Sequence, residues 1–172
     1  MTLYNILGFM TFIVACAAAA APGVKFRPGE WYAHLEKPPW TPPDWLFAPV
    51  WTVLYFMIAI AGFLVWTEGQ ESGVSSLQDG HETDDVLPLA VFALQLVLNA
   101  LWSVLFFGLR RPGYAFAEIV ALWLTILVTI ILFFPIQPVA GWLLIPYLLW
   151  VSFAAGLNYS VWQRNIEAKG AG

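Results

Sequence analysis

The sequence predicts an all-α membrane protein, a five transmembrane helix bundle. Of its 172 residues, 60% are hydrophobic and 10% are charged, whereas an ordinary soluble domain has about 25% charged residues. Five apolar runs are long enough to cross a bilayer, and all Lys and Arg residues fall between or after them in alternate segments. This composition excludes a soluble enzyme and a disordered chain. The net charge of -4 offers no basic surface for nucleic acid.

The five predicted spans follow from length alone. A helix needs about 20 apolar residues to cross a hydrocarbon core about 30 Å thick. Runs of that length occupy residues 3–21, 46–66, 87–107, 114–134 and 139–161. Only Glu118 brings a charge into any of them. We expect residues 1–172 to form a single domain.

Prolines mark the expected ends and bends of these spans. Pro22 and the glycine after it are expected to end the first span. Pro49 and Pro88 stand in the first turns of the second and third spans, where a missing N–H costs little. Pro146 lies inside the fifth span and is expected to bend it.

The positions of the basic residues predict the orientation. Five crossings put loop 1 (between the first two spans), loop 3 (between the third and fourth) and the C-terminus on one side. These segments hold all seven Lys and Arg residues. In a bacterial inner membrane the positive-inside rule places them in the cytoplasm and the N-terminus outside. The first run lacks the basic start of a signal peptide, so we interpret it as a span.

Loop 2, residues 67–86, is the most polar segment of the chain. It holds six acidic residues and no Lys or Arg. The sequence therefore predicts a flexible, solvated loop. The acidic residues of loop 2 do not have the spacing of metal ligands, and the rest of the sequence predicts no metal site either.

Loop 1 and the start of the second span form the first notable stretch. Residues 31–51 hold four Trp and five Pro residues, and paired prolines oppose a regular helix. Loop 1 is expected to lie at the membrane surface, where tryptophans typically form an interfacial belt. Trp40 and Trp45 are interpreted as members of such a belt. A stiff lid over a cavity is the alternative interpretation.

The second and third notable stretches lie in the predicted spans 87–107 and 139–161, and each places polar and aromatic residues on one helix face. Gln95, Asn99 and Trp102 share a helix face with Phe106, and Tyr147, Trp150, Ala154 and Asn158 share another. Buried amides either bridge helices or line a polar pocket. The directions of the spans bring both faces, with the start of the second span, together beneath loop 1. Such a pocket suits a large, flat, hydrophobic ligand.

Glu118 is an acid inside a predicted span, and such residues are functional candidates by default. It lies about one turn from loop 3. Pairing with Arg110 or Arg111, or contact with water, is therefore the interpretation we favour.

These stretches resemble the translocator protein family, also called the tryptophan-rich sensory protein (TspO/MBR) or peripheral-type benzodiazepine receptor family. The resemblance covers about residues 5 to 164. The matching positions are Trp31, Tyr32, Leu35, Lys37, Pro38, Trp40, Pro42, Pro43, Pro49 and Trp51; Gln95, Asn99, Trp102, Ser103, Phe106 and Phe107; and Pro146, Tyr147, Trp150, Phe153, Ala154, Leu157, Asn158 and Tyr159.

The resemblance implies a homodimer of five-helix bundles whose ligand cavity is closed by loop 1. It also implies binding of porphyrins, haem, sterols or benzodiazepine-site drugs. The implied ligand positions are Trp31, Tyr32, Trp51, Tyr55, Gln95, Asn99, Trp150 and Ala154; the polar and aromatic faces add Trp102 and Tyr147. The family's sterol motif corresponds to Leu157, Tyr159 and Arg164.

Three functional hypotheses follow. The first is a porphyrin-binding protein that senses, regulates or degrades its ligand in light, with Trp51 and Trp150 matching the family's photochemical tryptophans. It needs no cofactor and is no classical enzyme; protoporphyrin IX or haem is its ligand. The second is a transporter of porphyrin or sterol. The third is an interaction protein that signals stress.

Overall fold

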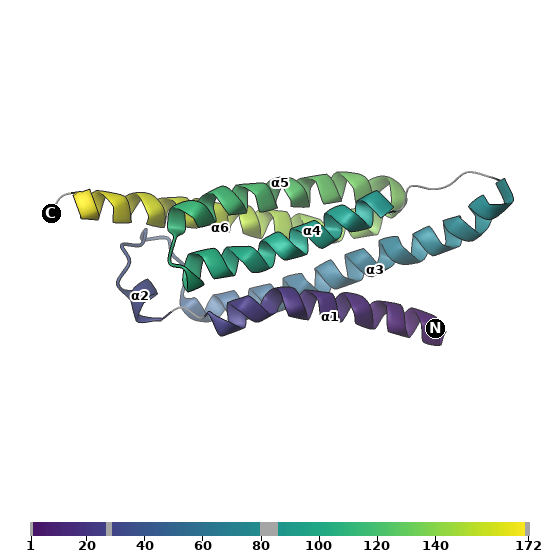
Figure 1. The fold of residues 1–172 in the computed structure, drawn as a ribbon, viewed down its shortest axis with the longest axis horizontal. Coiled ribbons are helices and arrows are strands. Elements are labelled where there is room, and N and C mark those ends of the chain that lie inside the picture. The colour runs from purple at the N-terminus through teal and green to yellow at the C-terminus, as the bar shows by residue number, and fades with distance from the viewer. Residues whose placement is uncertain (1, 27–28, 80–85, 171–172) are drawn as a thin grey trace.

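The fold is a bundle of five long helices, confirming the predicted class. The computed structural model describes residues 2–26, 29–79 and 86–170. Five of its helices are long and apolar enough to span a membrane, and the described residues contain no strand. The N- and C-termini lie at opposite ends of the bundle, as an odd number of crossings requires (Figure 1).

The spans are carried by α1 (Leu3–Lys25), α3 (Phe47–Asp79), α4 (Val86–Ser103), α5 (Pro112–Ile136) and α6 (Pro138–Gly170). Helix α4 continues directly into a π-helical turn, η2 (Val104–Gly108). Loop 1 contains the short helix α2 (Glu30–Ala33) and the 3-10 turn η1 (Asp44–Leu46).

The bundle is organised around α4, α5 and α6. Helix α5 packs most extensively on α6 and on α4, while α1 packs on α3 and α4, and α3 also packs on α6. The buried side chains between these helices are almost entirely apolar or aromatic. The buried polar residues among those described are Gln95, Asn99, Glu118, Thr129 and Asn158.

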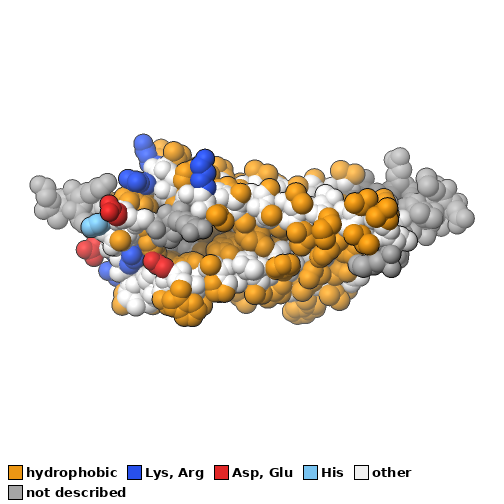
Figure 2. Space-filling model, turned by 90° about the horizontal axis from the view of Figure 1, so that it is seen from below, with side chains coloured by type: hydrophobic (Ala, Val, Ile, Leu, Met, Phe, Trp, Pro, Cys, Tyr) orange, Lys and Arg blue, Asp and Glu red, His pale blue; other side chains and the backbone are white. Residues whose placement is uncertain are grey.

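The outer surface is that of a membrane protein. Large apolar side chains cover the middle of the face seen in Figure 2, whereas the charged side chains gather at the end that carries loop 1. Of the most apolar part of α1, only 11% of residues are buried within the chain. Because water would penalise so much exposed apolar area, this surface is suited to lipid or to another protein in the bilayer.

The first helix is longer than expected, and the prediction that Pro22 ends it was wrong. Helix α1 runs on to Lys25, with Pro22 inside it. The N–H of Phe26 donates to the carbonyl of Pro22 at 2.8 Å. A proline removes only the hydrogen bond that its own nitrogen would donate, so the bonds donated by later residues can still form.

The prediction of a flexible loop over residues 67–86 was also wrong for its first part. Helix α3 continues without interruption to Asp79, while residues 80–85 lie outside the described residues. The acidic composition suggested a loop, but the stretch after Trp66 contains no proline, and its Glu, Gln and Leu residues have good helix propensity.

Loop 1 packs across the end of the bundle. The ring of Trp40 contacts that of Phe153 on α6, with centroids 5.7 Å apart. Asn165 of α6 holds the loop backbone on both sides of Glu36: its Oδ1 accepts from the Glu36 N–H at 3.2 Å and its Nδ2 donates to the Glu36 carbonyl at 3.1 Å. These contacts hold loop 1 against the C-terminal half of α6.

Candidate ligand-binding site

A hydrogen-bonded chain of side chains crosses the bundle between α3, α4 and α6. The Tyr55 hydroxyl donates to Asn99 Oδ1 at 2.6 Å, and Asn99 Nδ2 donates to the Tyr147 oxygen at 2.7 Å. The Tyr147 hydroxyl donates in turn to Gln95 Oε1 at 3.0 Å. The predicted convergence of the three polar faces is therefore confirmed. We call these four residues the amide–phenol network.

Tryptophans flank this network on the loop 1 side. The Trp51 ring lies 5.4 Å from that of Tyr55 and 6.2 Å from that of Tyr147, measured between centroids. Trp150 stands one helical turn beyond Tyr147 and contacts Phe47 and Phe153, at 5.8 and 5.5 Å. The network therefore has indole rings from both α3 and α6 beside it.

Two buried donors in this region have no hydrogen-bond partner among the residues that the structure describes. They are Gln95 Nε2 and Trp150 Nε1. Leaving a buried donor unpaired costs about 1–3 kcal/mol, so such groups are uncommon in the core of a native protein. Both are predicted ligand residues, and both can donate to an acceptor on a bound molecule.

Trp102 belongs to a second polar link nearer to loop 3. Its Nε1 donates to Asn158 Oδ1 at 3.0 Å, and Asn158 Nδ2 donates to the carbonyl of Pro112 at 2.8 Å. This link ties α4, α6 and the start of α5 together. The sequence left open whether these polar faces bridge helices or line a pocket. At Trp102 and Asn158 the face bridges helices.

Trp31 and Tyr32 lie on α2 and pack on η2, the π-helical turn that continues α4. Their rings contact Phe106 at 5.9 and 6.2 Å between centroids. Tyr32 is buried, and Lys37 Nζ lies 4.2 Å from the centre of its ring. Burial, with a smaller effect from the Asp44 carboxylate, raises the pKa of the Tyr32 phenol, which therefore stays neutral at physiological pH.

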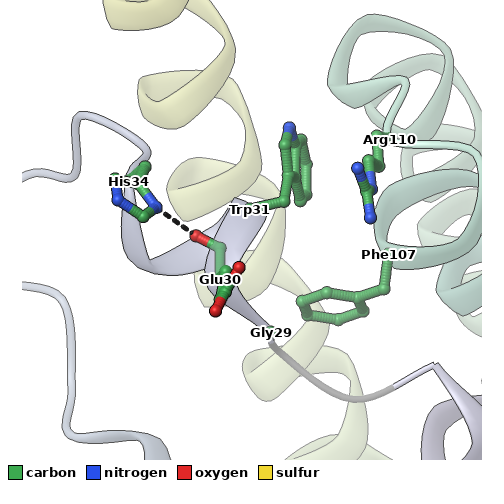
Figure 3. Close-up of a pocket in the computed structure, with 6 residues that line it drawn as sticks. All are labelled: Gly29, Glu30, Trp31, His34, Phe107 and Arg110. Carbon is green, nitrogen blue, oxygen red and sulfur yellow. Dashed lines mark hydrogen bonds between the residues drawn. The ribbon is translucent and has the colours of Figure 1, made fainter.

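An open pocket of about 470 Å³ lies at the loop 1 end of the molecule (Figure 3). It is lined by Gly29, Glu30, Trp31, His34, Phe107 and Arg110. Of the predicted ligand residues, it contains Trp31 alone. The amide–phenol network lies deeper in the bundle, where its side chains contact one another directly.

A family comparison decides what kind of protein this is. The sequence model of the TspO/MBR family matches residues 9–163. The chain belongs to the TspO/MBR family. Its relatives include Protein CrtK of Rhodobacter capsulatus, which is 40% identical over 157 residues, covering 91% of this chain and 92% of the relative. The tryptophan-rich sensory protein of Cereibacter sphaeroides is 38% identical, with 91% and 90% coverage.

Animal relatives match almost as well as bacterial ones. The human translocator protein is 36% identical over 159 residues, which cover 91% of this chain and 89% of the relative. The match extends across all five membrane-spanning helices. Membership of the TspO/MBR family and the five apolar helices together make this chain an integral, multi-pass membrane protein.

Glu118 of this TspO/MBR protein does not behave as we expected. Its side chain is buried in α5, and neither carboxylate oxygen has a hydrogen-bond partner within the described part of the chain. Of the interpretation that we favoured, the pairing of Glu118 with Arg110 or Arg111 is therefore wrong. Arg111 instead lies 5.9 Å from the ring centre of Tyr114, so its charge is directed to the outer surface of α5.

The residues of the sterol motif do not form one surface. Leu157 is buried, Tyr159 is 47% exposed and packs on Phe116, and Arg164 Nε donates to Ser160 Oγ at 3.4 Å. Ala154 is half-buried against the main core.

Sequence reasoning missed two features of this TspO/MBR site. The π-helical turn η2 displaces Phe106 and Phe107 from the regular helical spacing. The Asn165 contacts with loop 1 join residues 129 positions apart. Neither leaves a periodic signal, although an asparagine near the end of an apolar helix could have indicated a capping role.

Proposed function

We propose that this protein binds porphyrins, including protoporphyrin IX and haem, and related flat hydrophobic ligands at the amide–phenol network and its flanking tryptophans. The observation that most strongly supports this proposal is the pair of buried donors without a hydrogen-bond partner, Gln95 Nε2 and Trp150 Nε1. A ligand with acceptors on an otherwise apolar, planar frame would satisfy both donors. The indoles of Trp51 and Trp150 and the ring of Tyr147 supply apolar faces for such a frame.

Binding at this depth requires the packed side chains to separate. Loop 1 is the segment that covers this end of the bundle, and it is held to α6 by Asn165 and by the contact between Trp40 and Phe153. We infer that these contacts break and reform as ligand enters. In this proposal loop 1 acts as the lid that sequence analysis gave as the alternative to an interfacial belt. The 49% exposed Trp40 and 71% exposed Trp45 also suit the interfacial belt.

The test is a titration of the purified protein in detergent with protoporphyrin IX in dim light. Tryptophan quenching and the porphyrin absorbance band report binding. We expect saturable binding that is weakened at least tenfold by Trp150→Ala and by Gln95→Leu, because each change removes an unpartnered donor. Trp142→Ala is the matched control, because Trp142 is 66% exposed at the opposite end of α6.

Each outcome has a clear meaning. Weakened binding in the two site variants but not in the control supports the proposal. Equal affinity in all four proteins would place the ligand elsewhere and overturn it. A melting curve for every variant separates lost binding from lost folding.

The resemblance also suggested roles beyond binding. We propose that the protein works as a homodimer, since the lipid-facing surface of α1 remains largely uncovered by its own chain. Transport of porphyrin or sterol is the alternative function that the names of the translocator relatives suggest, and stress signalling is a second alternative, since another relative is named a sensory protein. Faster porphyrin uptake into proteoliposomes than into empty vesicles would establish transport.

A further inference from the structure

The open pocket at the loop 1 end is built on unusual backbone. Its wall at Phe107 belongs to the π-helical turn η2, in which the Leu109 N–H donates five residues back, to Val104, at 2.7 Å. Single π-helical turns are frequently found at functional sites. Arg110 follows with a φ of 55°, a left-handed conformation that is uncommon outside glycine.

This backbone places one guanidinium beside two aromatic rings. Figure 3 shows Arg110 facing Trp31 across the pocket, with Phe107 below them. A guanidinium binds a carboxylate through two parallel hydrogen bonds, and its planar shape also suits the neighbourhood of aromatic rings. The combination favours a ligand that carries a carboxylate on a flat aromatic frame.

The other side of the pocket limits the charge of that ligand. Glu30 brings a carboxylate, and His34 Nδ1 is 2.6 Å from the Glu30 carbonyl oxygen. Donation from Nδ1 to that carbonyl leaves His34 Nε2 as an acceptor in the neutral imidazole. Arg110 is the basic residue in the described lining, so the pocket can pair with one carboxylate group of a ligand, and any further acidic group would have to lie away from Glu30.

A series of contacting rings connects this pocket to the interior. Trp31 contacts Phe106, and Phe106 stacks on Trp102 with centroids 5.2 Å apart and planes inclined by 20°. Trp102 is joined in turn to Asn158 of α6. An aromatic ligand bound in the outer pocket would therefore contact Trp31, the first ring of a series that leads to the helix face carrying Asn99 and Gln95.

We propose that this pocket is an outer binding site for amphipathic aromatic carboxylates, in which Arg110 holds the carboxylate and Trp31 and Phe107 contact the ring system. The inference rests on the proposed function, because the porphyrin expected in the interior belongs to this class. The outer site recognises the acidic edge of the ligand at the membrane surface, whereas the interior recognises the ring.

The experiment compares protoporphyrin IX with its dimethyl ester, which keeps the ring but has no carboxylate. Both are titrated against wild type, Arg110→Gln and Arg111→Gln in the same detergent. We expect wild type to bind the free acid roughly tenfold more tightly than the ester, which corresponds to one charge-assisted contact. Arg110→Gln should reduce that ratio to about one. Arg111→Gln, which changes the next residue outside the pocket, should preserve it.

The outcomes separate this inference from the proposed function. An unchanged ratio in Arg110→Gln, or an equal loss in both arginine variants, overturns the outer site, while ester binding that still depends on Trp150 leaves the interior site standing. Absence of saturable binding of either porphyrin by wild type overturns both. Trp31→Ala provides a second variant, and it should weaken the free acid and the ester together.

Discussion

At the scale of single residues, Asn99 has a central position in the amide–phenol network. It accepts a hydrogen bond from Tyr55 and donates one to Tyr147, thereby joining helices α3 and α6 through α4. Its side chain is buried, with 4% of its surface exposed. Because no water is at hand in the hydrocarbon region to replace a lost partner, each hydroxyl depends on this amide.

Replacing Asn99 with Leu should destabilise the protein. The hydroxyl of Tyr55 would lose its acceptor, and a buried polar group without a partner costs about 1–3 kcal/mol. We expect a lower melting temperature in detergent. Adding Tyr55→Phe to Asn99→Leu should recover much of the loss, because removing both members of a pair is far less costly than removing one, whereas the Tyr147 hydroxyl still donates to Gln95 Oε1. A double variant no more stable than Asn99→Leu alone would contradict this account.

The two flanking tryptophans allow a test of light-dependent chemistry. An excited porphyrin can accept an electron from an indole, which is more easily oxidised than a phenyl ring. Trp51→Phe combined with Trp150→Phe should therefore slow the light-driven loss of bound protoporphyrin IX at least tenfold. The rates are compared at porphyrin concentrations that saturate each protein, because Trp150→Phe also removes the unpartnered Nε1 donor and is expected to weaken binding. Porphyrin fluorescence is followed under illumination, with Trp142→Phe as the control. An unchanged rate in the double variant would exclude these indoles from the reaction.

At the scale of elements, glycine permits close packing of three helices. A Cβ on Gly62 of α3 would lie 2.7 Å from ring atoms of both Phe12 on α1 and Phe92 on α4. Gly156 of α6 differs, since nothing lies within 4 Å of its Cβ position. Close packing against a glycine therefore occurs at Gly62 but not at Gly156 within this chain.

Alanine substitution should therefore have opposite effects at these two glycines. Gly62→Ala should lower stability by about 1–3 kcal/mol, because two aromatic rings must move. Gly156→Ala should be neutral or stabilising by up to about 1 kcal/mol, since alanine favours the helix and meets no obstacle. Melting temperatures of the two variants in the same detergent test the difference. Similar destabilisation at both positions would indicate that Gly156 contacts something outside this chain.

The sequence predicted the helices better than it predicted their ends and partners. Apolar run length reveals a span because the bilayer imposes a minimum length, and periodicity revealed the faces carrying Gln95 and Asn99. The end of α1 beyond Pro22, the turn η2 and the unpaired Glu118 were not predicted. Each of these features depends on contacts between residues that are far apart in the sequence. A local sequence pattern does not reveal such contacts.

At the scale of the whole molecule, charge divides the two ends. Every Lys and Arg lies in loop 1, loop 3 or the C-terminal segment, and Figure 2 shows basic side chains gathered at the loop 1 end. Glu68, Glu71 and Asp79 lie toward the opposite end of α3. We propose, from the positive-inside rule, that loop 1 faces the cytoplasm in a bacterial inner membrane.

Single cysteines test this orientation. In a Cys16→Ala background, Gln70→Cys should react with a membrane-impermeant maleimide on intact spheroplasts. Asp44→Cys should react only after permeabilisation. Both native side chains are exposed at opposite ends of the second span, and neither substitution removes a basic residue. The reverse labelling pattern would show that the protein is inserted the other way round.

The unbroken helix α3 also has a mechanical consequence. The same rod that carries Trp51 and Tyr55 beneath loop 1 continues past Trp66 to Asp79, a further length of about 20 Å at about 1.5 Å per residue. A tilt of about 10° around Trp66 would therefore move the outer end by about 3 Å. Rearrangement of the rings beneath loop 1 can in this way be converted into a displacement on the other side of the membrane.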